Sequence, residues 1–145
     1  MLLISACLAG IPCRYDGGAN PVPALAELAA RGEAIPVCPE VLGGLPTPRI
    51  PSERLADGRV INAAGEDVTE AFALGAQRAL AVCRAQGCTR AVLKARSPSC
   101  GRDVIYDGSF THSLVPGDGV FAALLRAEGV EVLTEEEYLA GEGRA

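Results

Sequence analysis

The stretch Leu2-Leu3-Ile4-Ser5-Ala6, followed at once by Cys7, decides the fold of this chain. This apolar run is short, and a segment containing Gly10 and Pro12 ends it, so it predicts a buried strand rather than a helix. It is the first of several short apolar runs that alternate with stretches of helical pattern. Such alternation is typical of an α/β protein.

The rest of the sequence continues this alternation. Further strands are expected at residues 34–37, 90–93 and 130–133. Helices are expected from Pro23 to Ala30 with a stop at Gly32, from a cap at Asp67 or Thr69 to a stop at Gly87, and from Val120 to Glu128. The order implies a mainly parallel sheet with right-handed crossovers and helices on both faces, in a single α/β domain over residues 1–145.

Shorter segments lie between these elements. Residues 38–51 hold four prolines and two adjacent glycines, so we expect a shaped loop there with neither helix nor strand pairing. Residues 59–61 are expected to form one arm of a small hairpin, and residues 104–108 a short strand and turn. Thr134 is expected to cap a final acidic turn at residues 135–137.

Composition narrows the functional class. A net charge of -5 on 145 residues argues against binding of duplex nucleic acid, which needs clustered Lys and Arg. No stretch approaches the roughly 18 apolar residues of a membrane span, and the segment Met1–Gly10 lacks the basic region of a secretory signal. We therefore expect a cytoplasmic protein without a membrane partner.

The six cysteines fall into two groups. In a reducing compartment they are expected to be metal ligands, catalytic groups or small buried residues rather than disulfides. Cys83 and Cys88 lie at the end of a predicted helix and in the turn after it, where cysteine packs as a small hydrophobe. Cys7, Cys38 and Cys100 each follow a predicted strand, and the carboxyl ends of parallel strands share one edge of a sheet. These three are expected to converge.

Three converging thiolates favour soft-ligand chemistry. The candidates are a zinc site with one open position and an iron-sulfur cluster with one incompletely ligated iron. An open position implies substrate binding, whereas Cys13 as a fourth ligand would make the site structural. Spacing alone also allows that the three cysteines are simply buried behind loops.

Polar residues accompany these cysteines. Glu40 follows Cys38 by two positions and is a candidate to activate water or pass protons, with loop or helix capping as the alternative. Ser97 and Ser99 are candidates to hold an anionic oxygen, although serines in turns are usually turn formers. Thr111 belongs to a polar turn that begins with an Asp-Gly pair, which is also a common hairpin signal.

Six segments together carry a specific resemblance that covers nearly the whole chain: residues 5–10 (SACLAG), 13–17 (CRYDG), 38–49 (CPEVLGGLPTPR), 67–72 (DVTEAF), 94–101 (KARSPSCG) and 105–111 (IYDGSFT). With these segments the sequence resembles the DUF523 family, which includes the thiouracil desulfidases. The resemblance implies a Rossmann-like three-layer α/β sandwich carrying a [4Fe-4S] cluster.

By the same resemblance Cys7, Cys38 and Cys100 are the cluster ligands, Glu40 is the acid/base group, and Ser97 orients substrate or water. The implied reaction removes sulfide from a thiolated nucleobase, nucleoside or nucleotide without net redox change, after the thiocarbonyl sulfur binds the free iron. The implied substrate contacts are Arg14, Tyr15, Arg49, Lys94, Ser99 and Thr111. Arg14, Arg49 and Lys94 either balance the charge of the cluster or bind a substrate phosphate.

Two positions depart from the family pattern: His112 stands where a glycine is common, and Phe121 where a threonine is frequent. His112 is the only histidine, and it receives no catalytic role. Two other functions compete with the enzyme, namely an iron-sulfur redox or sensor module closed by Cys13 and a zinc-stabilised binding domain without catalysis. The oligomeric state stays open. Purification in air is expected to remove or replace the cluster.

Overall fold

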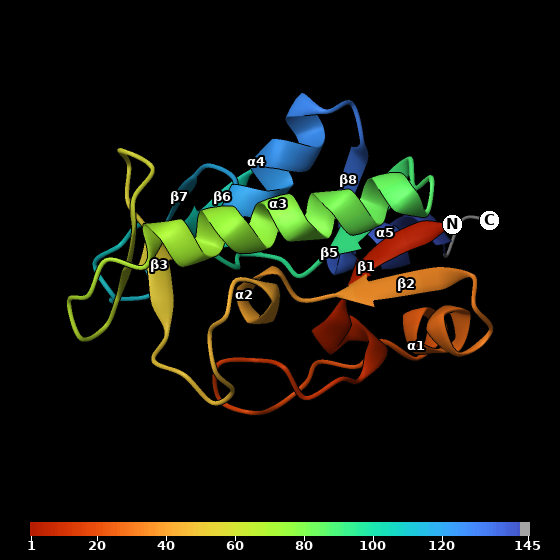
Figure 1. The fold of residues 1–145 in the computed structure, drawn as a ribbon, viewed down its shortest axis with the longest axis horizontal. Coiled ribbons are helices and arrows are strands. Elements are labelled where there is room, and N and C mark those ends of the chain that lie inside the picture. Colours follow the sequence, from red (N-terminus) through yellow and green to blue (C-terminus); the bar gives the residue numbers. More distant parts are fainter. Residues whose placement is uncertain (143–145) are drawn as a thin grey trace.

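A four-stranded parallel sheet forms the centre of the computed structural model, which describes residues 1–142 (Figure 1). The strand order is β2-β1-β5-β8, and one row across the sheet joins Ile35, Leu3, Ala91 and Val132. The strands span Leu2–Ser5 (β1), Ala34–Val37 (β2), Arg90–Leu93 (β5) and Glu131–Thr134 (β8). The expected parallel sheet is confirmed, with its last strand one residue later than predicted.

Helices cover both faces of this sheet, so the expected three-layer sandwich is confirmed. On one face Leu3, Ala91 and Val132 pack against α3 (Thr69–Ala85) and α4 (Val120–Ala127). On the other face Ile4 and Val92 pack toward α1 (Pro23–Ala30) and α5 (Glu135–Glu142). Successive strand residues point to opposite faces, so the middle of each strand is apolar on both sides.

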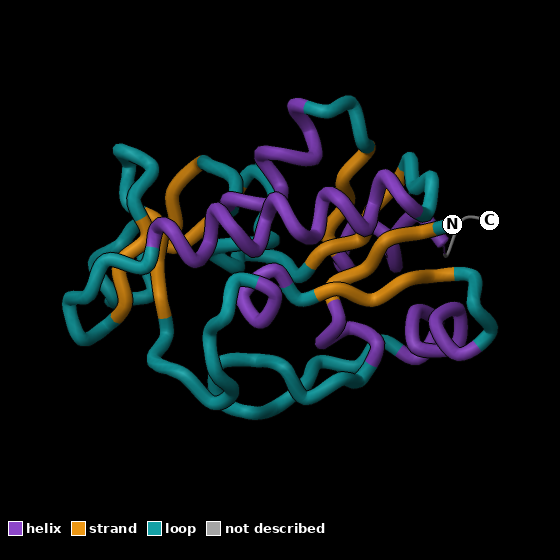
Figure 2. Tube along the Cα trace, viewed as in Figure 1, coloured by secondary structure: helices purple, strands orange, loops and turns teal. Residues whose placement is uncertain are grey.

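Two small antiparallel sheets lie beyond the carboxyl edge of the central sheet, at the left of Figure 2. One pairs β3 (Ser52–Arg54) with β4 (Val60–Asn62), and the other pairs β6 (Val104–Tyr106) with β7 (Leu114–Pro116). Both contain segments that the sequence predicted as short strands. These two small sheets form a second layer of structure beyond the carboxyl edge.

The structure tests three local predictions, namely the loop after Cys38 and the caps of two helices. The segment after Cys38 begins with a one-turn helix, α2 (Pro39–Leu42), rather than a continuous loop. Proline is compatible with the first position of a helix because a backbone N–H there would have no hydrogen-bond partner within the helix. The N-cap position of α3 is Val68 rather than Asp67 or Thr69, but Asp67 Oδ1 accepts from Thr69 N at 2.9 Å and so satisfies one free N–H at the helix start. The hydroxyl of Thr69 instead accepts from Val60 N on β4.

The cap of α5 is confirmed. Thr134 Oγ1 accepts a hydrogen bond from Glu137 N at 3.1 Å, and Thr134 N donates to Glu137 Oε1 at 3.0 Å. This reciprocal pair gives a hydrogen-bond acceptor to each of two backbone N–H groups at the start of α5, those of Thr134 and Glu137.

Two glycines let α2 lie directly on the backbone of α3. A Cβ at Gly75 would overlap the carbonyl oxygen of Pro39, and a Cβ at Gly43 would overlap the carbonyl oxygen of Ala71. Only glycine permits such close approach of two backbones. The position of α2, and with it the positions of Cys38 and Glu40, therefore depends on these two glycines.

Candidate metal centre and active site

Cys7, Cys38 and Cys100 line one cavity of about 670 Å³ at the carboxyl edge of the central sheet. Glu40, Ser97 and the buried Cys13 line the same cavity. The three strand-end cysteines thus come together from segments that are far apart in the sequence. All of them are free thiols.

Cys7 and Cys38 are each held in place by hydrogen bonds to their backbone carbonyl groups. Cys7 lies in the short 3-10 helix η1 (Ala6–Ala9), directly after β1, and its carbonyl accepts from Gly10 N and Asn20 N. Cys38 is the N-cap of α2, and its carbonyl accepts from Leu42 N. These bonds fix the Cα positions of the two residues independently of any ligand.

Cys100 is held by the start of α4. Val120 N donates to Pro98 O at 2.9 Å, and Phe121 N donates to Ser99 O at 2.8 Å. Gly119 lies so close to the Ser99 carbonyl that a Cβ there would overlap it. The free N–H groups of a helix start thus bind the loop that presents Cys100.

The thiols differ in their protonation. Burial raises the pKa of Cys7 to about 11 and that of Cys100 to about 12, and the charge of Cys38 contributes to both shifts. A hydrogen bond with Cys13 holds the pKa of Cys38 below its usual range and raises the pKa of Cys13. Cys38 is therefore the thiol most readily present as the thiolate that a metal ligand requires.

The three cysteine thiols at the cavity are a donor set that an iron-sulfur cluster takes. Within residues 1–142, no three His, Cys, Asp or Glu side chains are arranged to hold one metal ion. Thiolates on one zinc ion would each lie about 2.3 Å from it, and so would be close together. A cluster distributes its thiolates over several iron atoms. Three soft donors on separate loops around one cavity match that requirement.

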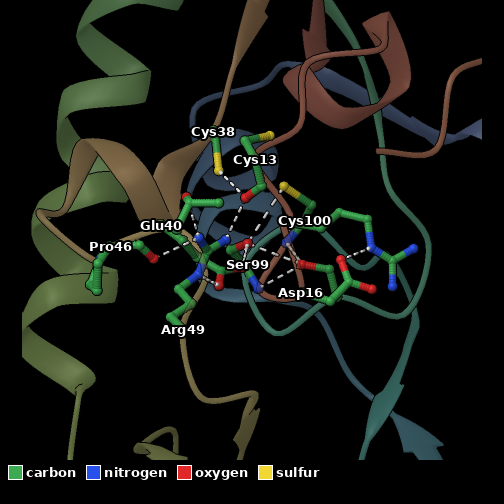
Figure 3. Close-up of polar contacts among 11 residues, drawn as sticks. Cys13, Asp16, Cys38, Glu40, Pro46, Arg49, Ser99 and Cys100 are labelled. Carbon is green, nitrogen blue, oxygen red and sulfur yellow. Dashed lines mark hydrogen bonds and ion pairs between the residues drawn. The ribbon is translucent and has the colours of Figure 1, made fainter. Parts of the chain in front are cut away.

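A hydrogen-bond network surrounds Glu40, whose side chain is 15% exposed (Figure 3). Glu40 Oε2 accepts from Ser99 Oγ at 2.9 Å, and Ser99 Oγ lies 3.0 Å from Ser97 Oγ. Ser97 Oγ also accepts from the backbone N–H groups of Ser99 and Cys100. Because those bonds occupy its lone pairs, Ser97 donates to Ser99 and Ser99 donates to Glu40.

Arg49 anchors the other side of Glu40 and is only 6% exposed. Its Nε donates to Glu40 Oε1 at 3.1 Å, and its Nη2 donates to Cys13 O at 2.8 Å. Its Nη1 donates to Pro46 O and Thr47 Oγ1. Every guanidinium nitrogen of this predicted substrate contact has a protein acceptor, so the geometry suits the orientation of Glu40.

The other predicted substrate contacts are placed as follows. Arg14, Tyr15, Lys94 and Ser99 line the cavity. Lys94 Nζ lies 3.2 Å from Glu135 Oε2, whereas Arg14 donates to Asn20 Oδ1 at 2.6 Å and remains partly exposed. Thr111 is not among the cavity residues, and its hydroxyl lies 2.6 Å from Ser109 Oγ and 2.8 Å from Ser113 Oγ.

Sequence reasoning missed part of the cavity wall. Glu53, Tyr106 and Phe110 were not assigned to the site, yet they line it from β3 and from the β6–β7 hairpin, and His112, noted as a departure from the family pattern, lines it beside them. The three rings at positions 106, 110 and 112 were a usable signal, because they are close together in a chain with few aromatic residues. Glu53 carried no local signal.

Comparisons with known proteins agree with this geometry. The model of the family described as 2-thiouracil desulfurase matches residues 2–137. Among solved structures, the chain is similar to the [4Fe-4S]-dependent thiouracil desulfidase TudS (DUF523Vcz), with a TM-score of 0.88, 46% identity and 97% of each chain covered. The uncharacterized protein YbbK of Bacillus subtilis (strain 168) is 39% identical over 146 residues, covering 94% of this chain and 97% of that protein.

Proposed function

This chain belongs to the 2-thiouracil desulfurase family, and we propose that it is a [4Fe-4S]-dependent enzyme that hydrolytically removes sulfide from thiouracil or a 4-thiouridine-type nucleoside or nucleotide. One observation carries the proposal. Cys7, Cys38 and Cys100 line one cavity together with the ion-paired carboxylate of Glu40. Soft metal ligands and an acid/base group therefore face the same cavity.

Cys7, Cys38 and Cys100 would hold the cluster. When bound, the cluster supplies an iron without a protein thiolate, which acts as a Lewis acid toward a thiocarbonyl sulfur. The overall reaction is balanced as R₂C=S + H₂O → R₂C=O + H₂S. It needs no external oxidant or reductant, and the protein must only move protons.

Glu40 is the group that moves them. Arg49 on Oε1 and Ser99 on Oε2 hold its carboxylate in one orientation at the cavity wall. As a general base it accepts a proton from the attacking water, and as a general acid it returns a proton to the departing sulfur. Ser97 holds the Ser99–Cys100 backbone and orients the Ser99 hydroxyl, so its contribution is positioning through the loop.

A nucleotide substrate is supported by the cation at the cavity wall. Arg14 is 30% exposed and its guanidinium lies 5.7 Å from the centre of the Tyr15 ring. Unlike Arg49, Arg14 keeps part of its surface open to a phosphate. Asp16 Oδ1 lies 3.5 Å from Arg14 Nε, which weakens the attraction of Arg14 for a phosphate but leaves its guanidinium partly exposed.

Anaerobic reconstitution with iron and sulfide, followed by assay, tests the proposal. The loaded protein is incubated with 2-thiouracil, 4-thiouracil and 4-thiouridine monophosphate, and sulfide and the oxygenated product are counted. We expect equal amounts of both, no consumption of reductant, and ¹⁸O in the product when the water is labelled. Absence of sulfide from all three substrates would overturn the proposal.

One alternative function is favoured by a specific observation, the presence of Cys13 in the same cavity beside Cys38. If Cys13 completed the cluster, the protein would be a redox or sensor module. Cys13→Ser separates the two functions. The enzyme retains its cluster absorbance and sulfide release within about twofold, whereas a closed cluster loses its fourth thiolate and its stability.

A further inference from the structure

Aromatic side chains are concentrated at the cavity. The chain has three Tyr, three Phe, one His and no Trp. Phe72 and Phe121 are buried, and Tyr138 packs against the core on the α1 side. The remaining four rings all line the cavity, and they belong to Tyr15, Tyr106, Phe110 and His112. All the aromatic rings that are not part of the core therefore lie at this one site.

Three of these rings come from a single hairpin. Tyr106 ends β6, and Phe110 and His112 lie in the loop that leads to β7. The rings of Tyr106 and His112 meet edge to face, with centroids 5.9 Å apart. Edge-to-face contact is a favourable arrangement of two rings, so the pair supports the loop from its own hairpin.

The loop keeps an unfavourable backbone. Phe110 has φ of 58° and His112 has φ of 60°, the left-handed region that side chains with a Cβ rarely adopt. Such conformations persist where the surrounding structure enforces them, and they concentrate at functional sites. Here they accompany the placement of two rings at the cavity wall.

The buried carboxylate of Glu53 enforces this conformation. Glu53 Oε1 accepts from Gly108 N at 2.9 Å and from Phe110 N at 3.1 Å. Glu53 lies on β3 and is 9% exposed, so the loop is fastened to the neighbouring small sheet by two hydrogen bonds to a charged acceptor. The side chain of Phe110 is thereby held at the cavity before any substrate arrives.

We propose that Phe110 is a specificity-determining residue that stacks on the planar ring of the substrate, with the Tyr106–His112 pair and Glu53 fixing its loop. This rests on the proposed function and adds to it the residue that selects cyclic, planar thiocarbonyl compounds over acyclic thioureas. Any base offers a π-face to an aromatic side chain, so stacking selects for a planar heterocycle without reading its hydrogen bonds.

Phe110→Leu is the first test, because it removes the ring and keeps an apolar side chain. With reconstituted enzyme, we expect KM for 2-thiouracil and the inhibition constant of uracil to rise roughly tenfold. We expect kcat to change less than about threefold and the cluster absorbance to stay unchanged, because the apolar side chain of Phe110 is neither a proposed cluster ligand nor a proton-transfer group. The preference for 2-thiouracil over N-methylthiourea in kcat/KM falls by the same factor.

Two further variants act as controls, and a third tests the support of the loop. Phe110→Tyr restores a ring and returns KM to the wild-type value. Leu114→Ala changes an exposed residue on β7 of the same hairpin and leaves KM unchanged. His112→Asn keeps a residue that tolerates the left-handed backbone but removes the ring facing Tyr106, and it raises KM by a smaller factor. This last variant changes an exposed position, so it tests the hairpin without disturbing the core.

Unchanged KM and uracil inhibition in Phe110→Leu, with an intact cluster, would overturn the inference and leave the proposed desulfidation standing. If the wild-type enzyme released no sulfide, the proposed function would fail first. Binding of 2-thiouracil to wild type and to Phe110→Leu, measured by equilibrium dialysis, would then decide the inference separately. Equal affinities would overturn it, and a roughly tenfold difference would support it.

Discussion

Cys88 and Cys100 stand on either side of the same strand, and they illustrate two different uses of a buried thiol. Cys88 precedes β5 and packs with Cys83, whose Sγ lies 3.5 Å from the Cys88 carbonyl oxygen. Cys100 follows β5 and lines the cavity with Cys7 and Cys38. Both Cys88 and Cys100 are less than 10% exposed. Burial therefore does not distinguish them, and their position relative to the sheet does.

The reason lies in the geometry of a parallel sheet. At the amino edge, Cys83 in the last turns of α3 and Cys88 in the turn after it pack into the apolar core, which Cys100 also contacts from the opposite edge. At the carboxyl edge, loops diverge from neighbouring strands and leave room for a ligand. The same residue type is thus a small hydrophobe at one end of β5 and a candidate metal ligand at the other.

The largest expected effect comes from exchanging the cavity thiol. Cys100→Ser should abolish stable cluster binding and reduce sulfide release to background, because one of three soft ligands is lost. The matched control is Cys88→Ser, which should retain iron and activity. Iron content, cluster absorbance and sulfide release measure both. Equal iron loss in the two variants would remove the contrast between the two edges.

Glu40→Gln is expected to reduce kcat about 10²- to 10³-fold, because the amide cannot exchange the proton that the carboxylate carries. Cluster absorbance should remain at the wild-type level, since Glu40 is not among the proposed ligands. This outcome would sharpen the comparison by separating metal binding from proton transfer within the carboxyl edge. Wild-type turnover in the variant would exclude Glu40 as the acid/base group.

Gly75→Ala is expected to destabilise the fold by about 2–3 kcal/mol, because its Cβ would overlap the Pro39 carbonyl and push α2 away. Since α2 carries Glu40 and begins at Cys38, sulfide release should fall at least about tenfold. Gly141→Ala in α5 meets no neighbouring atom and serves as the matched helical control. Thermal unfolding and activity should both be unaffected by this control, or stability slightly raised.

Cys83→Ala has the smallest expected effect on the site. Loss of the buried sulfur and of its contact with the Cys88 carbonyl should cost about 1–2 kcal/mol in the free energy of unfolding. Cluster content and kcat should stay within about twofold of wild type. Denaturant unfolding and cluster absorbance test this. Loss of the cluster without loss of stability would assign this region a role that packing does not explain.

Much of the architecture was predictable from local pattern. The strands at residues 34–37 and 90–93 were predicted with the observed bounds, because a short apolar run between breaks specifies a buried strand. The one-turn helix after Cys38 was not predicted, since its four residues lie among prolines and are stabilised by contact with α3 rather than by their own propensity.

The site divides in the same way. The strand-end positions of Cys7, Cys38 and Cys100 were readable from the sequence and led to the expectation that they converge. The buried position of Arg49 was not readable, because its acceptors at Glu40, Cys13 and the 46–47 segment come together only on folding. Its ion pair with Glu40 could therefore be identified only from the folded structure.

The sequence by itself determined the order of strands and helices, the sheet edge that receives the three cysteines, and the segments that carry the family resemblance. These depend on patterns within a few residues of one another. Only the tertiary structure decided that Gly43 and Gly75 seat α2 on α3, and that Glu53 fastens the loop bearing Phe110. Those contacts join residues at least 28 positions apart, and their energies depend on a geometry that exists only in the folded chain.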